Sequence, residues 1–223
     1  MTSYAVALVV VLCLALGLVL VHLEAQKAQG QSSSKMLRGA ITSGSTGPAK
    51  GVTYTHGIFS TQTRLIQQTY GIEPGEIDLA CFPLFGLFSM AMGMTVVIPD
   101  MDPTKPAEAD PVKLIEAIEA HGCTSAFGSP AIWKNMAVYA RKNGLKLPSM
   151  RRILMAGAPV PVWMHEAFQE IFDGTAQLHT PYGATESLPV ASIGSHEILA
   201  DTAARTRNGE GTCVGRPVAD VEI

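Results

Sequence analysis

The stretch from Thr42 to Gly51, TSGSTGPAKG, combines three glycines and four hydroxyl side chains with a single lysine. Glycines allow a loop to fold tightly around a ligand, and consecutive backbone N–H groups beside Ser and Thr hydroxyls suit phosphate oxygens. Lys50 would add a positive point charge. A flexible linker has a similar composition, but it rarely carries a lysine at its far end with a helical pattern directly behind it. The residues therefore indicate a phosphate-binding loop.

This loop is not the P-loop of nucleoside triphosphatases. The P-loop pattern is G-x-x-x-x-G-K-[ST], whereas here Ala49 precedes Lys50 and Gly51 follows it. The residues that we expect to contact the phosphates of a nucleotide are Thr42, Ser43, Gly44, Ser45, Thr46, Gly47 and Lys50.

Two further stretches combine glycine with polar or aromatic side chains, MAGAPV at 155–160 and TPYGATES at 180–187. We expect both on loops, because ligands of open α/β sheets collect beyond the carboxyl ends of the strands. Tyr182 offers a stacking face for a base, Thr185 a hydroxyl for a phosphate oxygen, and Glu186 a hard oxygen ligand for Mg²⁺. Taken singly, residues of these types also fit a core aromatic, a turn and a solvated charge.

Together, and in this order, the three stretches resemble those of the adenylate-forming superfamily, the AMP-binding enzymes that include the acyl-CoA synthetases. The loop of that family is written TSGSTGxPKG, and a Gly-Ala-Pro turn and a YGxTE motif follow it. In this chain Pro48 and Ala49 stand in exchanged order. Because both precede Lys50, we expect little damage to the loop.

The resemblance implies ATP and Mg²⁺ as cofactors and gives each stretch a role. The Gly-Ala-Pro turn would line the base and the acyl pocket, the tyrosine would contact adenine, Thr185 the α-phosphate, and Glu186 would hold Mg²⁺. The catalytic residues that it implies are Lys50, Thr185 and Glu186. The nucleotide-binding residues that it implies outside the phosphate loop are Gly157, Ala158, Pro159, Tyr182, Gly183 and Thr185.

A narrower resemblance rests on Phe82 to Pro111, FPLFGLFSMAMGMTVVIPDMDPTKPAEADP, together with SPAIW, YGATE and GTCVGRPV. These stretches are similar to those of the β-lactone synthetases of bacterial olefin biosynthesis, which activate a long-chain β-hydroxy acid with ATP and close it to a β-lactone without coenzyme A. The resemblance implies a fatty acid or β-hydroxy fatty acid substrate and partner proteins of an olefin pathway. The side chains that either face its alkyl chain or form ordinary core are Phe85, Phe88, Met90 and Met92.

Two alternatives to this function stay open: a long-chain acyl-CoA synthetase, and a truncated, non-catalytic remnant that binds nucleotide or serves as a membrane-attached interaction module. The resemblance covers about residues 40–223. In the family, a large subdomain precedes these motifs, and an aspartate for the ribose and a small domain with a lysine follow them. Because loss of a positioned lysine costs orders of magnitude in rate, catalytic competence is left undecided.

Short apolar runs alternate with helical patterns from residue 52 onward, which predicts an α/β domain with a largely parallel sheet flanked by helices. By the resemblance this is part of the N-terminal domain of an adenylate-forming enzyme. The predicted strands are Ile77–Phe82, Thr95–Ile98, Cys123–Phe127 and Arg151–Met155. The predicted helices are His56–Thr69, a short one within Phe85–Gly93, one from Pro111 to Gly122, Pro130–Lys142 and Pro161–Phe172.

Composition excludes several classes of function. A formal charge of −3 over 223 residues, without a run of Lys or Arg, argues against nucleic acid as a partner. The four cysteines lie far apart and the six histidines lack metal-ligand spacing, so neither a zinc site nor a disulfide framework is indicated. A reducing compartment is the natural interpretation.

Residues 4–23, YAVALVVVLCLALGLVLVHL, are almost wholly apolar and long enough for a single transmembrane helix. No Lys or Arg precedes the run and basic residues follow it, which disfavours a signal peptide and places the remainder on the cytoplasmic side of the membrane. We therefore expect a transmembrane helix up to residue 23, a linker over 24–35 and a partial AMP-binding domain over 36–223. If the apolar segment is a mistaken start, the protein is cytoplasmic.

Overall fold

The computed structural model describes residues 36–42 and 50–223, with the backbone alone at 36–42, 50, 51 and 53. The predicted transmembrane helix, the linker and the loop residues Ser43 to Gly47 lie outside these ranges and stay predictions. Among the described residues, no helix is both long enough and apolar enough to span a bilayer. The chain divides into two compact units between Ser60 and Thr61.

The first unit contains an antiparallel pair of strands, β1 (Met36–Thr42) and β2 (Lys50–Thr55). In this pair Thr42 lies opposite Lys50, so the two ends of the predicted phosphate-binding loop meet across the ladder. Helix α2 (His56–Tyr70) begins directly after β2, where the Thr55 hydroxyl accepts a hydrogen bond from the Ile58 N–H at 3.1 Å. The predicted helix His56–Thr69 is confirmed.

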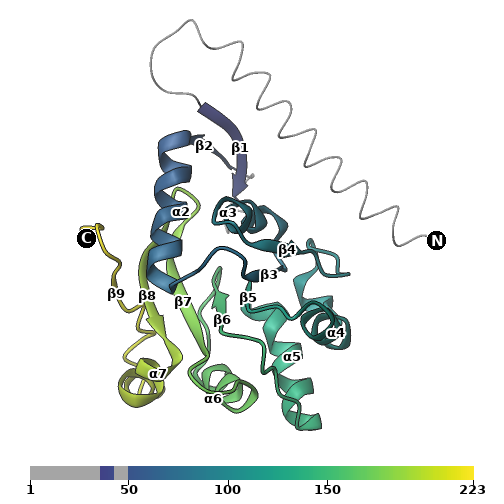
Figure 1. Ribbon diagram of the computed structural model, residues 1–223. Coiled ribbons are helices and arrows are strands. Elements are labelled where there is room, and N and C mark those ends of the chain that lie inside the picture. The colour runs from purple at the N-terminus through teal and green to yellow at the C-terminus, as the bar shows by residue number, and fades with distance from the viewer. Residues whose placement is uncertain (1–35, 43–49) are drawn as a thin grey trace, which may run out of the picture. The chain divides into compact units, whose positions relative to one another are not determined.

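The second unit is built on a seven-stranded sheet with the order β4-β3-β5-β6-β7-β8-β9 (Figure 1). The strands from β4 to β7 run parallel, whereas β8 is antiparallel to β7 and β9 to β8. The largely parallel sheet that the sequence predicts is therefore confirmed. The strands are β3 (Ile77–Ala80), β4 (Thr95–Val97), β5 (Ser125–Gly128), β6 (Arg152–Met155), β7 (Gln177–Ala184), β8 (Ser187–Gly194) and β9 (Arg216–Pro217).

Helices flank this sheet, and the sequence marks the ends of several of them. The Asp110 carboxylate accepts a hydrogen bond from the Val112 N–H at 2.9 Å at the start of α4, and Gly122, at φ 62°, ends it. The helical segments are η1 (Pro83–Phe85), α3 (Gly86–Ala91), η2 (Pro106–Glu108), α4 (Pro111–His121), α5 (Pro130–Asn143), α6 (Val162–Ile171), α7 (Ser195–Glu197), the π-helical η3 (Ile198–Thr202) and α8 (Ala203–Arg207).

The two faces of the sheet are covered by different helices. Leu178 of β7 belongs to the main core with residues of α4, α5 and α6, in which Trp133 and Phe168 meet edge to face. The next residue, His179, packs instead against the ring of Tyr70 in α2, with ring centroids 5.2 Å apart. Because successive strand residues point to opposite faces, α2 covers the face opposite to α4, α5 and α6.

A buried charged network lies at the amino ends of the parallel strands. Arg152, at the start of β6, pairs with Glu76 just before β3 at 2.6 Å, and the Thr124 hydroxyl donates to the same carboxylate at 2.9 Å. Burial acts to raise the pKa of Glu76, but the hydrogen bonds from Arg152, Glu73 and Thr124 and the charge of Arg152 outweigh it and lower that pKa. Glu76 is therefore held as a carboxylate inside the fold.

The sequence prediction was wrong in placing TPYGATES on a loop. Residues 180–184 form the second half of β7, which turns directly into β8. Proline and glycine are uncommon inside strands, so Pro181 and Gly183 make this stretch of sequence look like a loop rather than a hairpin. The remaining strand predictions are confirmed with shifts of one or two residues; the shifts of two are at β3, which ends at Ala80 rather than Phe82, and at β5, which begins at Ser125 rather than Cys123.

Candidate functional site

The turn after β6 presents Gly157, Ala158 and Pro159 to solvent. It is held at both ends, because Met155 and Val160 are buried in the core and the Ala156 N–H donates to the Gly128 carbonyl at 3.2 Å. Gly157 has a φ of 90°, which an L side chain rarely adopts. The turn therefore offers backbone groups to a ligand on a rigid base, as the sequence predicts for a loop beyond a strand.

The β7–β8 hairpin carries Tyr182 and Gly183 on its first strand and Thr185 and Glu186 at its tip. Tyr182 pairs with Ala191 and Ala184 with Ser187, and the register shifts between Tyr182 and Ala184. Gly183 fits this shift because a Cβ at that position would lie 2.3 Å from the Ser187 carbonyl oxygen. Tyr182 is 55% exposed and Glu186 is exposed, so both are open to a ligand.

The register of β6 with β7 brings these two stretches to one edge of the sheet. Leu154 pairs with His179, so Met155, the last residue of β6, lies level with Thr180, and the glycine turn begins there. From there β7 continues for four residues past the end of β6, which carries the hairpin tip about 13 Å outward. The glycine turn therefore leaves β6 at the level of Thr180, and Tyr182 follows on the same end of β7, whereas Thr185 and Glu186 lie farther out at the hairpin tip.

The remaining predicted site residues divide between the first unit and the undescribed loop. Thr42 and Lys50 are the paired ends of β1 and β2 in the first unit. Ser43, Gly44, Ser45, Thr46 and Gly47 lie outside the described residues.

Gln62 is a residue at the hairpin that the sequence analysis missed. Its side-chain amide donates a hydrogen bond to the Thr185 carbonyl at 3.2 Å, although the two residues are 123 positions apart. Gln62 is buried on the face of α2 that also buries Leu65, Ile66 and Tyr70. A polar residue on the apolar face of a predicted helix is the sequence signal that would have singled it out.

The aromatic segment after β3 is mostly core. Phe85, Phe88 and Met92 are buried, and the ring of Phe85 stacks on that of Phe127 with centroids 3.5 Å apart. Met90 is the exception at 43% exposed, and Phe82 and Leu84 are similarly exposed. Of the two interpretations of these side chains, ordinary core describes Phe85, Phe88 and Met92, and Met90 alone of the four is open to solvent.

Other reactive side chains of the described region are structural. Burial raises the pKa of both the Cys81 and the Cys123 thiol, the latter to about 11, and burial lowers the pKa of His165 and of His179 to about 4. At neutral pH these groups are uncharged and packed inside. In the part of the chain that the structure describes, no three His, Cys, Asp or Glu side chains gather into a metal site.

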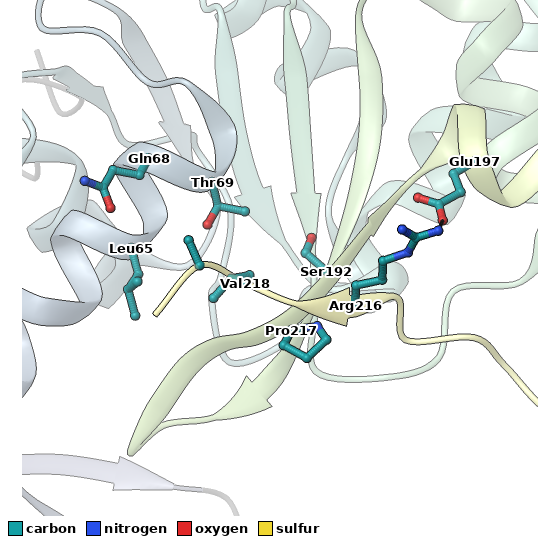
Figure 2. A pocket seen from close by; sticks show the side chains of 9 residues that line it. Leu65, Gln68, Thr69, Ser192, Glu197, Arg216, Pro217 and Val218 are labelled. Carbon is teal, nitrogen blue, oxygen red and sulfur yellow. Dashed lines mark ion pairs between the residues drawn. The ribbon is translucent and has the colours of Figure 1, made fainter. Parts of the chain in front are cut away.

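A small cavity of about 320 Å³ lies between α2, β8 and β9. Figure 2 shows Leu65 and Thr69 on one side of it and the Arg216–Glu197 ion pair, at 3.8 Å, on the other. None of the predicted site residues lines this cavity, so it is separate from the glycine turn and from the hairpin tip.

Comparison with known proteins identifies the family. The family of AMP-binding enzymes matches residues 40–223, and the chain belongs to this family. It is 49% identical over 183 residues to an olefin beta-lactone synthetase of Stenotrophomonas maltophilia and 48% identical to one of Xanthomonas campestris, with 82% of this chain covered in each case. The chain spans about a third of the length of these two relatives, 32% of each.

Solved structures share the fold. The N-terminal domain of FACL13 from Mycobacterium tuberculosis superposes with a TM-score of 0.65 at 20% identity, covering 86% of this chain and 46% of that one. O-succinylbenzoate coenzyme A synthetase (MenE) from Bacillus subtilis, solved with ATP and magnesium ion, gives a TM-score of 0.61 at 23% identity, covering 80% and 35%. The described α/β unit is therefore part of the N-terminal fold of adenylate-forming enzymes.

Proposed function

We propose that this chain provides the nucleotide-binding and acid-activating part of an AMP-forming ligase acting on a β-hydroxy fatty acid. The observation that carries the proposal is the β6–β7 register, which brings the end of β6, where the glycine turn begins, and the Tyr182 segment of β7 to one sheet edge. Family membership over residues 40–223 supports nucleotide chemistry at this edge. The relatives at 48–49% identity, both olefin beta-lactone synthetases, support the substrate class.

In the proposed reaction a carboxylate oxygen of the fatty acid attacks the α-phosphorus of ATP. The bond from that phosphorus to the bridging oxygen breaks, and pyrophosphate leaves with the electron pair. The β-hydroxyl oxygen of the acyl-AMP then attacks the acyl carbon, AMP departs, and the hydroxyl proton passes to solvent. The product is a four-membered lactone, and no coenzyme A is consumed.

The residues of this chain bind and orient the nucleotide in that reaction. Tyr182 gives the adenine a stacking face, and the exposed turn at Gly157 offers backbone groups beside it. Thr185 donates its hydroxyl to an α-phosphate oxygen, and Lys50 supplies positive charge to the phosphates. Holding the carboxylate and the α-phosphorus together is the larger part of such catalysis.

Magnesium fits the donors at the hairpin tip. Mg²⁺ usually keeps several waters and is bound through one or two carboxylates plus the phosphates of its substrate. A single exposed carboxylate at Glu186, with no three-ligand cluster among the described residues, agrees with that mode. When bound, the ion neutralises phosphate charge. MenE, which shares the fold, was solved with ATP and magnesium.

An acyl-CoA ligase is the second candidate. A long-chain-fatty-acid–CoA ligase of Thermus thermophilus is 26% identical over 155 residues, covering 68% of this chain and 28% of that protein. Both functions share the first half-reaction and differ in whether the hydroxyl of the substrate or the thiol of coenzyme A attacks the acyl-AMP.

Pyrophosphate release from ATP and a β-hydroxy fatty acid tests the proposal. We expect release without coenzyme A, and loss of release in both Lys50→Ala and Glu186→Ala. Release that requires coenzyme A would favour the acyl-CoA ligase. Absence of release under either condition, with ATP still bound, would identify a nucleotide-binding remnant and overturn the proposed activity.

A further inference from the structure

Gln62 is a polar side chain on a buried, otherwise largely apolar face of α2. The face of α2 that it shares with Leu65, Ile66 and Tyr70 is buried, and Gln62 itself is only 4% exposed. Burying an amide is unfavourable unless it forms hydrogen bonds. The Gln62 amide donates such a hydrogen bond to the Thr185 carbonyl, which lies at the tip of the β7–β8 hairpin.

The hairpin tip needs support from outside the sheet. Beyond Tyr182, β7 has passed the end of β6 and β8 has no further pairing with β9, so the tip is a two-stranded ribbon, and such ribbons are marginally stable alone. Helix α2 contacts the hairpin in two places: Gln62 bonds its tip, and the Tyr70 hydroxyl donates to Ser192 Oγ nearer its base at 3.0 Å. The helix therefore holds the hairpin at its tip and again at Ser192, where β8 pairs with β9.

The bonded carbonyl belongs to the peptide that joins Thr185 to Glu186. Fixing that peptide plane fixes the backbone from which both side chains leave. Those two side chains are the proposed ligands of the α-phosphate and of Mg²⁺, so a rotation of this peptide would move both of them together.

We propose that Gln62 is a positioning residue for nucleotide binding, which holds the Thr185–Glu186 peptide in the orientation that Mg²⁺·ATP requires. This inference rests on the proposed function of the hairpin tip. Gln62 acts through the Thr185 carbonyl and does not itself contact the nucleotide. A residue that only filled space would affect folding stability but not the orientation of Glu186.

The first test is hydrogen exchange of the full chain without nucleotide. In Gln62→Met, which keeps the side-chain length but removes the donor, we expect about tenfold faster exchange at the tip amides of residues 183–187 and no change near Gly194. The matched control is Gln68→Met, on the exposed face of the same helix, which should leave both regions unchanged. Unchanged exchange at the tip in Gln62→Met would overturn the proposal.

The second test is a double-mutant cycle on Mg²⁺·ATP affinity, measured by calorimetry. We expect Gln62→Met to weaken binding about tenfold in the wild-type background and less than about twofold when Glu186→Gln is already present. An equal loss in both backgrounds contradicts the positioning role. If Gln62→Met does not fold, Gln62→Asn, which is one methylene too short, serves in both tests with the same expected results.

The two tests separate the inference from the proposed function. If the wild-type chain binds no Mg²⁺·ATP, the proposed function fails and the nucleotide role of Gln62 fails with it, whatever the exchange result. If the wild-type chain binds Mg²⁺·ATP while Gln62→Met binds it equally well, the function stands and the inference alone is overturned.

Discussion

The two edges of the seven-stranded sheet use polar residues in opposite ways. At the amino edge, Glu76 and Arg152 are both buried and form an ion pair at 2.6 Å that Thr124 completes. At the carboxyl edge, Tyr182 and the glycine turn after β6 are exposed, and Glu186 is exposed farther out at the hairpin tip. The same sheet thus carries charge that is satisfied inside the fold at one edge and polar groups turned to solvent at the other.

This difference distinguishes residues that stabilise the fold from residues that are available to bind a ligand. A buried ion pair whose partners satisfy each other contributes to the fold but has little capacity left for a ligand. Exposed polar groups on a rigid turn or hairpin are not paired inside the fold in this way and can bind a ligand. The amino edge has its own hollow of about 660 Å³, lined in part by Arg151, Arg152 and His179, so the size of a hollow does not by itself identify the nucleotide site.

The largest effect is expected from breaking the buried pair. Arg152→Met removes the buried partner of Glu76 and leaves only the exposed Arg151, 3.8 Å away, as a counter-charge, which costs about 3–5 kcal/mol of unfolding free energy. For a chain of this size that corresponds to a fall in Tm of roughly 10 °C, measurable by calorimetry. Arg151→Met is the control, since Arg151 is exposed and 3.8 Å from the same carboxylate, and its effect should stay below about 1 kcal/mol. Equal effects of the two substitutions would contradict the assignment.

The hairpin tip should show the reverse pattern. Glu186→Gln removes the proposed Mg²⁺ ligand, so we expect the rate of pyrophosphate release to fall about a hundredfold or more. Because Glu186 is exposed, the free energy of unfolding should change by less than about 0.5 kcal/mol. Glu197→Gln, in α7 just after the hairpin, should leave the rate unchanged. If Glu186→Gln lowers the free energy of unfolding but not the rate of pyrophosphate release, Glu186 has a structural role and does not bind Mg²⁺.

Asp78, another buried acidic residue at the amino edge, should make the free energy of unfolding depend on pH. Burial raises the pKa of Asp78 to about 6 despite a hydrogen bond from Ser89 at 2.7 Å, so the folded state holds the proton longer than the unfolded state. Its contribution to stability is therefore complete below about pH 4 and is lost as pH rises through 6.

Asp78→Asn should abolish the loss of unfolding free energy that the wild type shows as pH rises through 6. Relative to the wild type, the variant should gain about 2 kcal/mol of unfolding free energy between pH 4 and pH 7, as followed by urea unfolding at each pH. A constant difference between the two proteins across that range would show that Asp78 is already ionised in the fold at low pH.

The smallest effect is expected at Tyr182, the proposed contact of the adenine base. Tyr182→Ala removes a stacking face and should weaken ATP binding about tenfold in a calorimetric titration. Tyr182→Phe keeps the ring and should bind within about twofold of the wild type. If the phenylalanine variant is as weak as the alanine variant, the hydroxyl and not the ring makes the contact.

The sequence predicted those features that depend on neighbouring residues. Asp110, Pro111 and Gly122 mark the ends of α4 by their own conformational preferences, and the pattern of proline and apolar residues predicted α5 and α6 equally well. The motif order was sufficient to predict the family, which the match over 40–223 confirms.

What the sequence could not show depends on partners distant in the chain. The pairing of β7 with β8 places Pro181 and Gly183 inside a strand, against their local preferences, because the register and the close approach at Gly183 require it. The contact of Gln62 with Thr185 joins residues 123 positions apart, which no local pattern encodes. The burial of Phe85 against Phe127 likewise depends on the packing of η1 on β5.

The most direct test of the account locates the nucleotide at one edge of the sheet. Mn²⁺·ATP broadens the NMR signals of amides close to the ion, and selective ¹⁵N labelling can compare the two edges in the same protein. We predict that the amide signals of Gly183, Thr185 and Glu186 broaden while those of Arg151 and Arg152 stay sharp. Broadening at the arginines with sharp signals at the hairpin tip would place the nucleotide in the hollow at the amino edge and contradict the account.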